Sequence, residues 1–357
     1  MTKARDLSQT PNASLGFKNR ILNGSMQIDQ RNNGSAVTIN NAAYIYTLDR
    51  WAGYGKSSAG VFTVTRSSVA PNNFTNSALI TVTTASTPSA GDLYGFRQGI
   101  EGFNFADFGW GTAAAQPATI SFWVRSSLTG TFGAAVFSND SNDAYPFTYT
   151  ISAANTWEQK SVTIPARASG SWNTTNGNGL NVWFCIGGGT TTTANTWNTA
   201  GGGLITPTGA TNIIATNGAT WQITGVQLEK GSTATSFDYR PYGTELALCQ
   251  RYCVSYGGSN LYEAVGYGFA ISTGIVNINT ATPVPMRAAP SLTTVGSWQI
   301  SDGVTGSVIF VLSVVSVQMG VQQLSIQATS SGLTTYRPYR IETANSTVSR
   351  IFYTAEL

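Results

Sequence analysis

Hydrophobic and polar residues alternate in many short runs between Lys18 and Tyr239, and glycine, asparagine, serine and proline separate these runs. Alternation with a period of two, combined with many β-branched and aromatic residues, is typical of half-buried β-strands. No part of this region keeps the 3.6-residue period of an amphipathic helix. The predicted strands are residues 61–65, 78–82, 119–124, 134–137, 147–151, 158–164, 179–186 and 221–228.

Short strands that follow one another without helices favour two packed antiparallel sheets, and we expect a jelly-roll β-sandwich over residues 18–240. Residues 187–220 consist mainly of Gly, Thr, Asn and Ala, and we expect a long excursion there between the last two strands. Long ordered loops of this kind are commonly functional. Residues 1–17 are polar and aperiodic, and we expect them to form an extended N-terminal anchoring arm.

Residues 241–255 contain the one helix candidate in the sequence, between Pro241 and the Gly257-Gly258 pair. β-patterning returns over residues 256–357, where prolines are expected at strand edges or in loops. The sequence therefore predicts an all-β protein, with a jelly roll, a short linker helix and a second, smaller β-sandwich. The strands predicted in the second sandwich are residues 269–278, 308–319, 322–328 and 351–355, and the prolines are Pro283, Pro285 and Pro290.

Charged residues make up 10% of the 357 residues, against about 25% in an average soluble domain, and histidine is absent. Hydroxyl and amide groups then keep the surface hydrated with little charge, which suits a shell protein or a binder of neutral partners such as glycans. A Ser-His-Asp triad is excluded, and the acids Asp92, Glu101 and Asp107 do not form the carboxylate pair of a glycosidase. We therefore expect no enzyme. The net charge of +3 comes from scattered basic residues, which predicts no binding of nucleic acid.

The three cysteines, Cys185, Cys249 and Cys253, are expected to be small buried residues rather than disulfide partners or zinc ligands. The first twenty residues lack the apolar core of a secretion signal. The longest apolar stretch, residues 308–317, is too short to cross a bilayer. We therefore expect synthesis in a reducing cytoplasm and no membrane insertion.

Residues 220–252 read TWQITGVQLEKGSTATSFDYRPYGTELALCQRY. The strand G-V-Q-L-E-x-G, the Phe-x-x-Arg-Pro that follows and a helix ending C-Q-R-Y resemble a segment common in bacteriophage tail fibre and related virion surface proteins. In those proteins a carbohydrate-binding-like jelly roll ends on such a strand. The other segments that carry the resemblance are Asn19-Arg20, Leu22-Asn23-Gly24, Leu48-Asp49-Arg50-Trp51, residues 121–126, residues 283–290 and Ala355-Glu356-Leu357.

This resemblance implies a structural protein of the virion surface, often trimeric and frequently in contact with host glycans. It leads us to expect a homotrimer that is assembled in the host cytoplasm and docks on other virion proteins through the N-terminal arm. A tail fibre is the leading interpretation. A head-decoration or head-fibre protein docked on the capsid is an alternative, because phages reuse this module in both places. A glycan depolymerase tailspike is a further alternative, although the short repeat of a β-helix is absent from the sequence.

Tryptophans in loops rich in Gly and Asn are the candidate carbohydrate-binding residues, because a pyranose face packs on a flat ring while amides bond to the hydroxyls. The alternative is that such rings pin their loops or face a neighbouring subunit. Tryptophans inside alternating runs are expected in the core; these are Trp51, Trp123, Trp183 and Trp221. The candidates are Trp110, Trp172 and Trp197, with Asn173 and Asn176 beside the second, and Tyr94, Tyr145 and Tyr262 as secondary candidates.

Two further groups of residues have candidate roles. Asp140 and Asp143 lie in a turn rich in oxygen ligands that suits Ca²⁺, although a plain Asx turn explains the same pattern and the EF-hand spacing is absent. No other cofactor is expected. Where the chain leaves the jelly roll, we expect a structural joint that pins the turn rather than contacting a ligand. Its residues are Glu229, Phe237, Arg240, Pro241 and Arg251.

Overall fold

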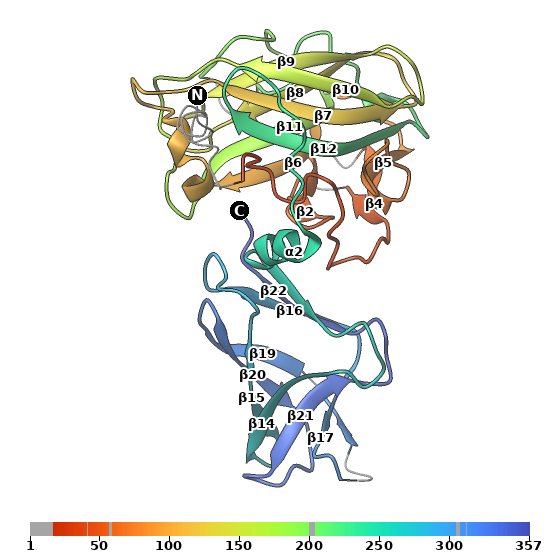
Figure 1. The fold of residues 1–357 in the computed structure, drawn as a ribbon. Coiled ribbons are helices and arrows are strands. Elements are labelled where there is room, and N and C mark those ends of the chain that lie inside the picture. The colour runs from red at the N-terminus through yellow and green to blue at the C-terminus, as the bar shows by residue number, and fades with distance from the viewer. Residues whose placement is uncertain (1–16, 41, 57–58, 200–203, 305–307, 312) are drawn as a thin grey trace, which may run out of the picture. The chain divides into compact units, whose positions relative to one another are not determined.

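The structure, a computed structural model, describes residues 17–40, 42–56, 59–199, 204–304, 308–311 and 313–357 (Figure 1). The predicted N-terminal arm, apart from Phe17, lies outside the described residues. The chain divides into two compact units. Unit 1 contains the N-terminal residues up to Met26, with Thr38–Tyr44 and Gly53–Arg240. Unit 2 contains Gln27–Val37, Ile45–Ala52 and Pro241–Leu357, so it is assembled from both ends of the sequence.

Unit 1 is a sandwich of two antiparallel sheets (Figure 1). In the first sheet the neighbouring strands are, in order, β1 (Val37–Ile39), β4 (Val61–Ser67), β5 (Ser77–Thr84), β12 (Thr220–Lys230), β7 (Ala118–Ser126) and β10 (Glu158–Ile164). In the second they include, in order, β3 (Ala52–Gly55), β6 (Leu93–Glu101), β11 (Asn178–Gly188), β8 (Gly130–Phe137) and β9 (Ala144–Ile151). The described loops contain the 3₁₀ turns η1 (Gly102–Asn104), η2 (Ala106–Phe108) and η3 (Ile213–Ala215).

Buried aromatic rings join the two sheets of unit 1. Phe122 on β7 lies 5.1 Å, between ring centroids, from Phe184 on β11, and 5.0 Å from Tyr149 on β9. The indole of Trp221 on β12 donates a hydrogen bond of 3.2 Å to the Tyr149 hydroxyl. Burial raises the pKa of this hydroxyl far above its ordinary value, so it remains protonated and available as a hydrogen-bonding group.

The predicted strands of the jelly roll correspond to β4, β5 and β7 to β12, and the all-β prediction is confirmed. Strand β6 escaped prediction because it is buried on both faces and does not alternate. Of the tryptophans predicted in the core, Trp51, Trp183 and Trp221 are buried. Trp123 is only half-buried, because its neighbours Phe122 and Val124 occupy the inner face of β7.

Unit 2 contains the second sandwich, in which the described residues form ten strands after the helix α2 (Tyr242–Gln250), and the short β2 (Ile45–Tyr46) before the helix. Its core is one hydrophobic cluster to which both sheets contribute, for example Tyr353, Ile278 and Ile341. A three-stranded sheet has the order β13 (Cys253–Tyr256), β22 (Arg350–Thr354) and β16 (Ser291–Val295). A seven-stranded sheet has the order β18 (Val308–Phe310), β17 (Trp298–Ser301), β21 (Pro338–Thr343), β14 (Ala264–Ser272), β15 (Ile275–Ala281), β20 (Gln323–Thr329) and β19 (Ser313–Met319).

Several sequence boundaries in unit 2 were wrong. Residues 269–278 form the β14–β15 hairpin rather than one strand, because Thr273-Gly274 makes a tight turn. Residues 308–319 are likewise divided between β18 and β19. The helix candidate 241–255 is helical only in α2, because Cys253 already begins β13. Pro283, Pro285 and Pro290 lie between β15 and β16, as expected, and α2 is the one α-helix among the described residues.

Two further expectations concern burial and membranes. All three cysteines are buried as expected, and burial raises the pKa of the Cys185 and Cys253 thiols to about 12. Such thiols are protonated at neutral pH and are poor nucleophiles. Within the described part of the chain, no helix has the length and apolar character needed to span a membrane.

Gly95 on β6 provides a test of packing between the strands of unit 1. The indole of Trp183 lies directly over Gly95, so that an added Cβ would overlap the ring. We expect Gly95→Ala to lower the free energy of unfolding of unit 1 by about 1–3 kcal/mol, the usual cost of overpacking. Gly243→Ala in α2 is the matched control, because nothing lies near its added Cβ. The control should be neutral or stabilising by up to about 1 kcal/mol, and equal urea midpoints for both variants would contradict this account.

Candidate functional site

An aromatic cluster joins three loop regions of unit 1 and the strand β9. Its members are Phe105, Phe108, Trp110, Tyr145, Trp172 and Trp197. The centroids of Trp110 and Trp172 are 4.9 Å apart, and those of Trp110 and Trp197 are 5.3 Å apart, both edge to face. The structure therefore brings together the three loop tryptophans that the sequence offered as sugar platforms. This convergence depends on the order of the strands and not on any local pattern.

The three tryptophans differ in exposure. Trp110 and Trp172 are 4% and 8% exposed, and their indole N–H groups donate to the carbonyls of Gln116 at 2.6 Å and Ser169 at 3.1 Å. Trp197 is half-buried, and its indole donates to a carbonyl at 3.2 Å. Trp110 and Trp172 thus form a small core beneath the loops, and Trp197 is the member of the three with solvent access. A ring held from below in this way is rigid before any ligand binds.

Arg167 connects the aromatic cluster to the acidic turn. Its guanidinium lies 5.4 Å from the centroid of the Trp197 ring, and its Nε donates to Asp143 Oδ1 at 2.7 Å. Asp143 is buried, whereas Asp140 is exposed. Among the described residues, no group of three or more His, Cys, Asp or Glu side chains is gathered in one place. The carboxylate proposed for Ca²⁺ is therefore the ion-pair partner of an arginine that sequence reasoning had not singled out.

The two asparagines near Trp172 occupy a turn. The side-chain oxygen of Asn173 accepts hydrogen bonds from the backbone N–H of Thr175 at 2.9 Å and from its hydroxyl at 3.1 Å. Asn176 is exposed. Asn173 thus stabilises its own loop through an Asx turn.

The joint begins in unit 1, where residues 231–240 fold back onto β12. The Glu229 carboxylate accepts hydrogen bonds of 2.8 Å from the backbone N–H and the hydroxyl of Thr235. The ring of Phe237 lies 5.1 Å from that of Phe74. The guanidinium of Arg240 donates to the carbonyl of Ile21 at 3.1 Å and also to the carbonyl of Asn19. These contacts tie the end of the jelly roll to its first residues.

The remaining joint residues belong to unit 2. Pro241 is the N-cap residue of α2, and its carbonyl accepts the N–H of Glu245 at 3.0 Å. The carbonyl of Arg251 accepts the N–H of Arg287 at 2.8 Å. Arg287 lies in the Pro-Val-Pro-Met-Arg-Ala-Ala-Pro segment, so two stretches that carry the virion resemblance meet at this hydrogen bond.

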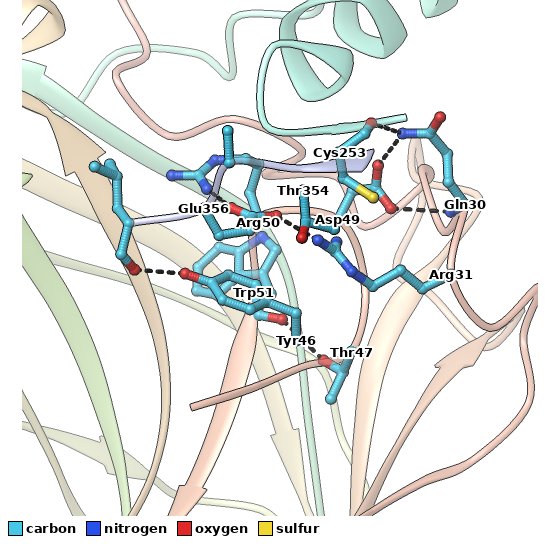
Figure 2. A network of polar contacts seen from close by, with 12 residues as sticks. Gln30, Arg31, Tyr46, Thr47, Asp49, Arg50, Trp51, Cys253, Thr354 and Glu356 are labelled. Atoms are coloured by element: carbon cyan, nitrogen blue, oxygen red, sulfur yellow. Dashed lines mark hydrogen bonds and ion pairs between the residues drawn. The ribbon is translucent and has the colours of Figure 1, made fainter. Parts of the chain in front are cut away.

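A buried polar network in unit 2 collects further segments of the resemblance (Figure 2). Its centre is the Glu356 carboxylate, which accepts hydrogen bonds from Arg31 at 2.9 Å and from Arg50. Arg50 is 1% exposed, and its guanidinium lies 3.6 Å from the centroid of the Tyr252 ring. We call Gln30, Arg31, Tyr46, Asp49, Arg50, Cys253 and Glu356 the Glu356 network.

Asp49 forms the second half of the Glu356 network. Its Oδ1 accepts the backbone N–H of Gln30 at 2.9 Å, and its Oδ2 accepts the side-chain amide of the same residue. That amide also donates to the carbonyl of Cys253 at 2.8 Å. Complete burial raises the pKa of Asp49, while the charge of Arg31 and the bonds from Gln30 oppose the rise.

Local backbone geometry points Arg50 into the network. The N–H of Thr47 donates to the carbonyl of Trp51 at 2.8 Å, and the N–H of Trp51 donates to that of Leu48 at 2.9 Å. Within this tight turn Arg50 has φ = 70°, a left-handed conformation that non-glycine residues rarely adopt. The strain is maintained because Glu356 and Tyr252 fix the side chain.

No family model and no curated protein matches the chain. Similar solved structures include the enzymatically active domain of tailspike protein 4 of bacteriophage CBA120, at 14% identity and a TM-score of 0.31. That match covers 60% of this chain and 21% of the tailspike chain, so the chain spans about a fifth of its length.

Two other similar structures are carbohydrate-binding modules. The family 11 module from Clostridium thermocellum, solved with a mixed-linked tetrasaccharide, is 10% identical over 54% of this chain and 95% of the module, with a TM-score of 0.30. The N-terminal CBM22-1–CBM22-2 tandem domain from Paenibacillus barcinonensis Xyn10C is 10% identical over 92% of this chain and 98% of the tandem, with a TM-score of 0.28.

The contacts of the Glu356 network indicate that the stability of unit 2 depends on the Glu356 carboxylate. Glu356→Gln keeps the side-chain shape but leaves the Arg50 charge buried opposite a neutral amide. We expect unit 2 to lose about 3–5 kcal/mol of stability, measured by urea unfolding and by faster hydrogen exchange of the β22 amides. The control is Asp107→Asn, which breaks surface ion pairs with Arg20 at 2.8 Å and Lys230 at 3.0 Å. It should cost at most about 1 kcal/mol, and a loss as large as that of Glu356→Gln would refute the assignment.

Proposed function

We propose that this chain is a non-enzymatic, glycan-binding protein of the bacteriophage particle surface, of the tail-fibre kind. The observation that supports this proposal is the half-buried ring of Trp197, which packs against the buried Trp110 and Trp172. An exposed indole offers a flat apolar face for a pyranose ring, and its rigid support removes the entropic cost of ordering a loop during binding. Arg167 and Tyr145 border the same ring, and the partly exposed guanidinium of Arg167 offers N–H donors to the sugar hydroxyls.

The proposed location on the virion is supported by the segments that resemble phage virion proteins, and not by the surface around Trp197. Asn19, Gly24 and Glu229 secure the end of the jelly roll, and Arg50 and Glu356 close unit 2. These roles make the segments parts of one architecture instead of isolated matches. We place the protein on the virion surface, with residues 1–17 as the arm that docks on other virion proteins.

Trp197→Ala tests the glycan-binding surface. We expect the wild-type protein to bind neutral glycans on an array, and the variant to bind about tenfold more weakly or worse, as for a central aromatic contact. Trp123→Ala is the matched control, because Trp123 is also half-buried but packs near Phe74 and Gly225. Near-ultraviolet circular dichroism checks that both variants are folded. Absence of glycan binding by the wild type, or equal binding by both variants, would disprove the proposal.

We also propose that the protein assembles as a homotrimer. One face of the seven-stranded sheet supports self-association, because Phe269 on β14 and Val315 on β19 are 46% and 48% exposed. The strand register aligns them in one row with Asn277 and Gln327. Exposed apolar side chains at both ends of a row of uncharged residues are typical of the central part of an interface.

Light scattering during size-exclusion chromatography tests this assembly. The wild-type protein should elute with the mass of three chains at micromolar concentration. Phe269→Asp should shift it to monomer, because the new carboxylate would be desolvated in the interface. Phe103→Asp, which changes an exposed phenylalanine of unit 1, should leave the trimer intact. A monomeric wild-type protein would end the proposal.

A further inference from the structure

A hollow of about 380 Å³ lies along β16 and β22 in unit 2. Arg31, Arg350 and Phe352 line it together with Thr293 and Thr354. The register places Thr293 opposite Phe352, and Ser291 opposite Thr354. Side chains on alternate positions share one face of a sheet, so these residues lie on the face opposite to Ile351 and Tyr353, which belong to the core. We call this feature the β16–β22 hollow.

The β16–β22 hollow is cationic. Two guanidinium groups line it, and its lining within the described part of the chain includes no carboxylate. The side chain of Arg350 makes no hydrogen bond or ion pair with any described residue. Arg31 and Arg50 face the carboxylates of Glu356 and Asp49 in the neighbouring network, so Arg350 supplies the unpaired charge of the hollow. The Nη1 of Arg31 lacks a hydrogen-bond partner among the described residues.

The other groups in the β16–β22 hollow suit a sugar. Asn32, Thr293 and Thr354 offer one amide and two hydroxyls, while Phe352 and Val295 provide an apolar surface for ring C–H groups. A second hollow of about 480 Å³ adjoins the first, because both are lined by Arg31 and Thr354. It adds Arg287, the hydroxyl of Ser291 and the carboxylate of Glu356, which is paired with Arg31. Volumes of this size accommodate small ligands.

We propose that the β16–β22 hollow binds an acidic saccharide, with its carboxylate or phosphate between Arg31 and Arg350. A guanidinium pairs with such an anion through charge-assisted hydrogen bonds, which are stronger than those to neutral hydroxyls. The lining of this hollow includes no residue of the aromatic cluster. Binding of an acidic saccharide here is therefore independent of neutral-glycan binding at Trp197. Nucleic acid is the less favoured polyanion, because the basic residues form no extended track.

The test uses the full chain and an array of uronate, sialate and phosphate-bearing oligosaccharides. Each uronate and sialate is paired with its neutral methyl ester. We expect at least one acidic saccharide to bind, and its neutral counterpart to bind at least about tenfold more weakly, since a charge-assisted hydrogen bond is lost. Arg350→Gln should weaken binding by a similar factor, and its fold should be retained because no described residue pairs with the Arg350 side chain. Lys56→Gln, which removes an exposed charge in unit 1, should have no effect.

A second pair of variants separates the hollow from the rest of the strand. Thr293 and Thr294 are both exposed and adjacent on β16, but successive side chains point to opposite faces. Thr293→Glu places a carboxylate in the hollow and should weaken binding about tenfold or more. Thr294→Glu makes the same change in charge on the other face and should leave binding intact.

Several outcomes would overturn the proposal. They are binding of no acidic saccharide, equal binding of acid and ester, an equal effect of both Thr variants, and competition by single-stranded DNA at the same charge concentration, which would indicate a general polyanion surface. Trp197→Ala should leave acidic binding unchanged. Loss of acidic binding in that variant would move the site to unit 1 and would likewise refute the assignment.

Discussion

The stability of unit 2 depends on the ion pairs of the Glu356 carboxylate. Two arginines that are far from it in the sequence, Arg31 and Arg50, share this carboxylate. Arg50 is almost completely buried, and a guanidinium in that position is strongly destabilising unless it is paired and hydrogen-bonded. The Tyr252 ring supports the same group, and Gln30 satisfies the neighbouring Asp49. The N-terminal parts of unit 2 are thus held by compensated charge as well as by packing.

The segments that resemble phage virion proteins share a structural task. Asn19 and Gly24 bond to Val226 on β12 in unit 1, and Asp49, Arg50 and Glu356 close unit 2. Residues selected for closing a fold carry little information about its ligand. The resemblance therefore indicates an architecture, whereas both proposed binding sites depend on side chains outside these segments, such as Trp197 and Arg350.

Local patterns predicted most of the strands, because alternation is a local consequence of burying one face of a sheet. The same rule missed β6, which is buried on both sides, and merged β14 with β15, whose turn is only two residues long. The residue types of the candidate sugar platform were also predictable. Their meeting was not, because loops after β6, β10 and β11 become neighbours only through the order of the strands in space. The pairing of Arg50 with Glu356 had no local signal either.

The discontinuous make-up of unit 2 has a consequence for its biogenesis. During synthesis from the N-terminus, all strands of the jelly roll have left the ribosome once Lys230 has emerged. Arg31 and Arg50 cannot form their ion pairs until Glu356 has been synthesised. Closing so long a loop is slow, because the chain loses conformational entropy before the stabilising contacts form. The nascent polypeptide therefore matures in two stages. A chain that stops before β22 would leave Arg31 and Arg50 without the Glu356 carboxylate, and β13 and β16 without the strand that lies between them.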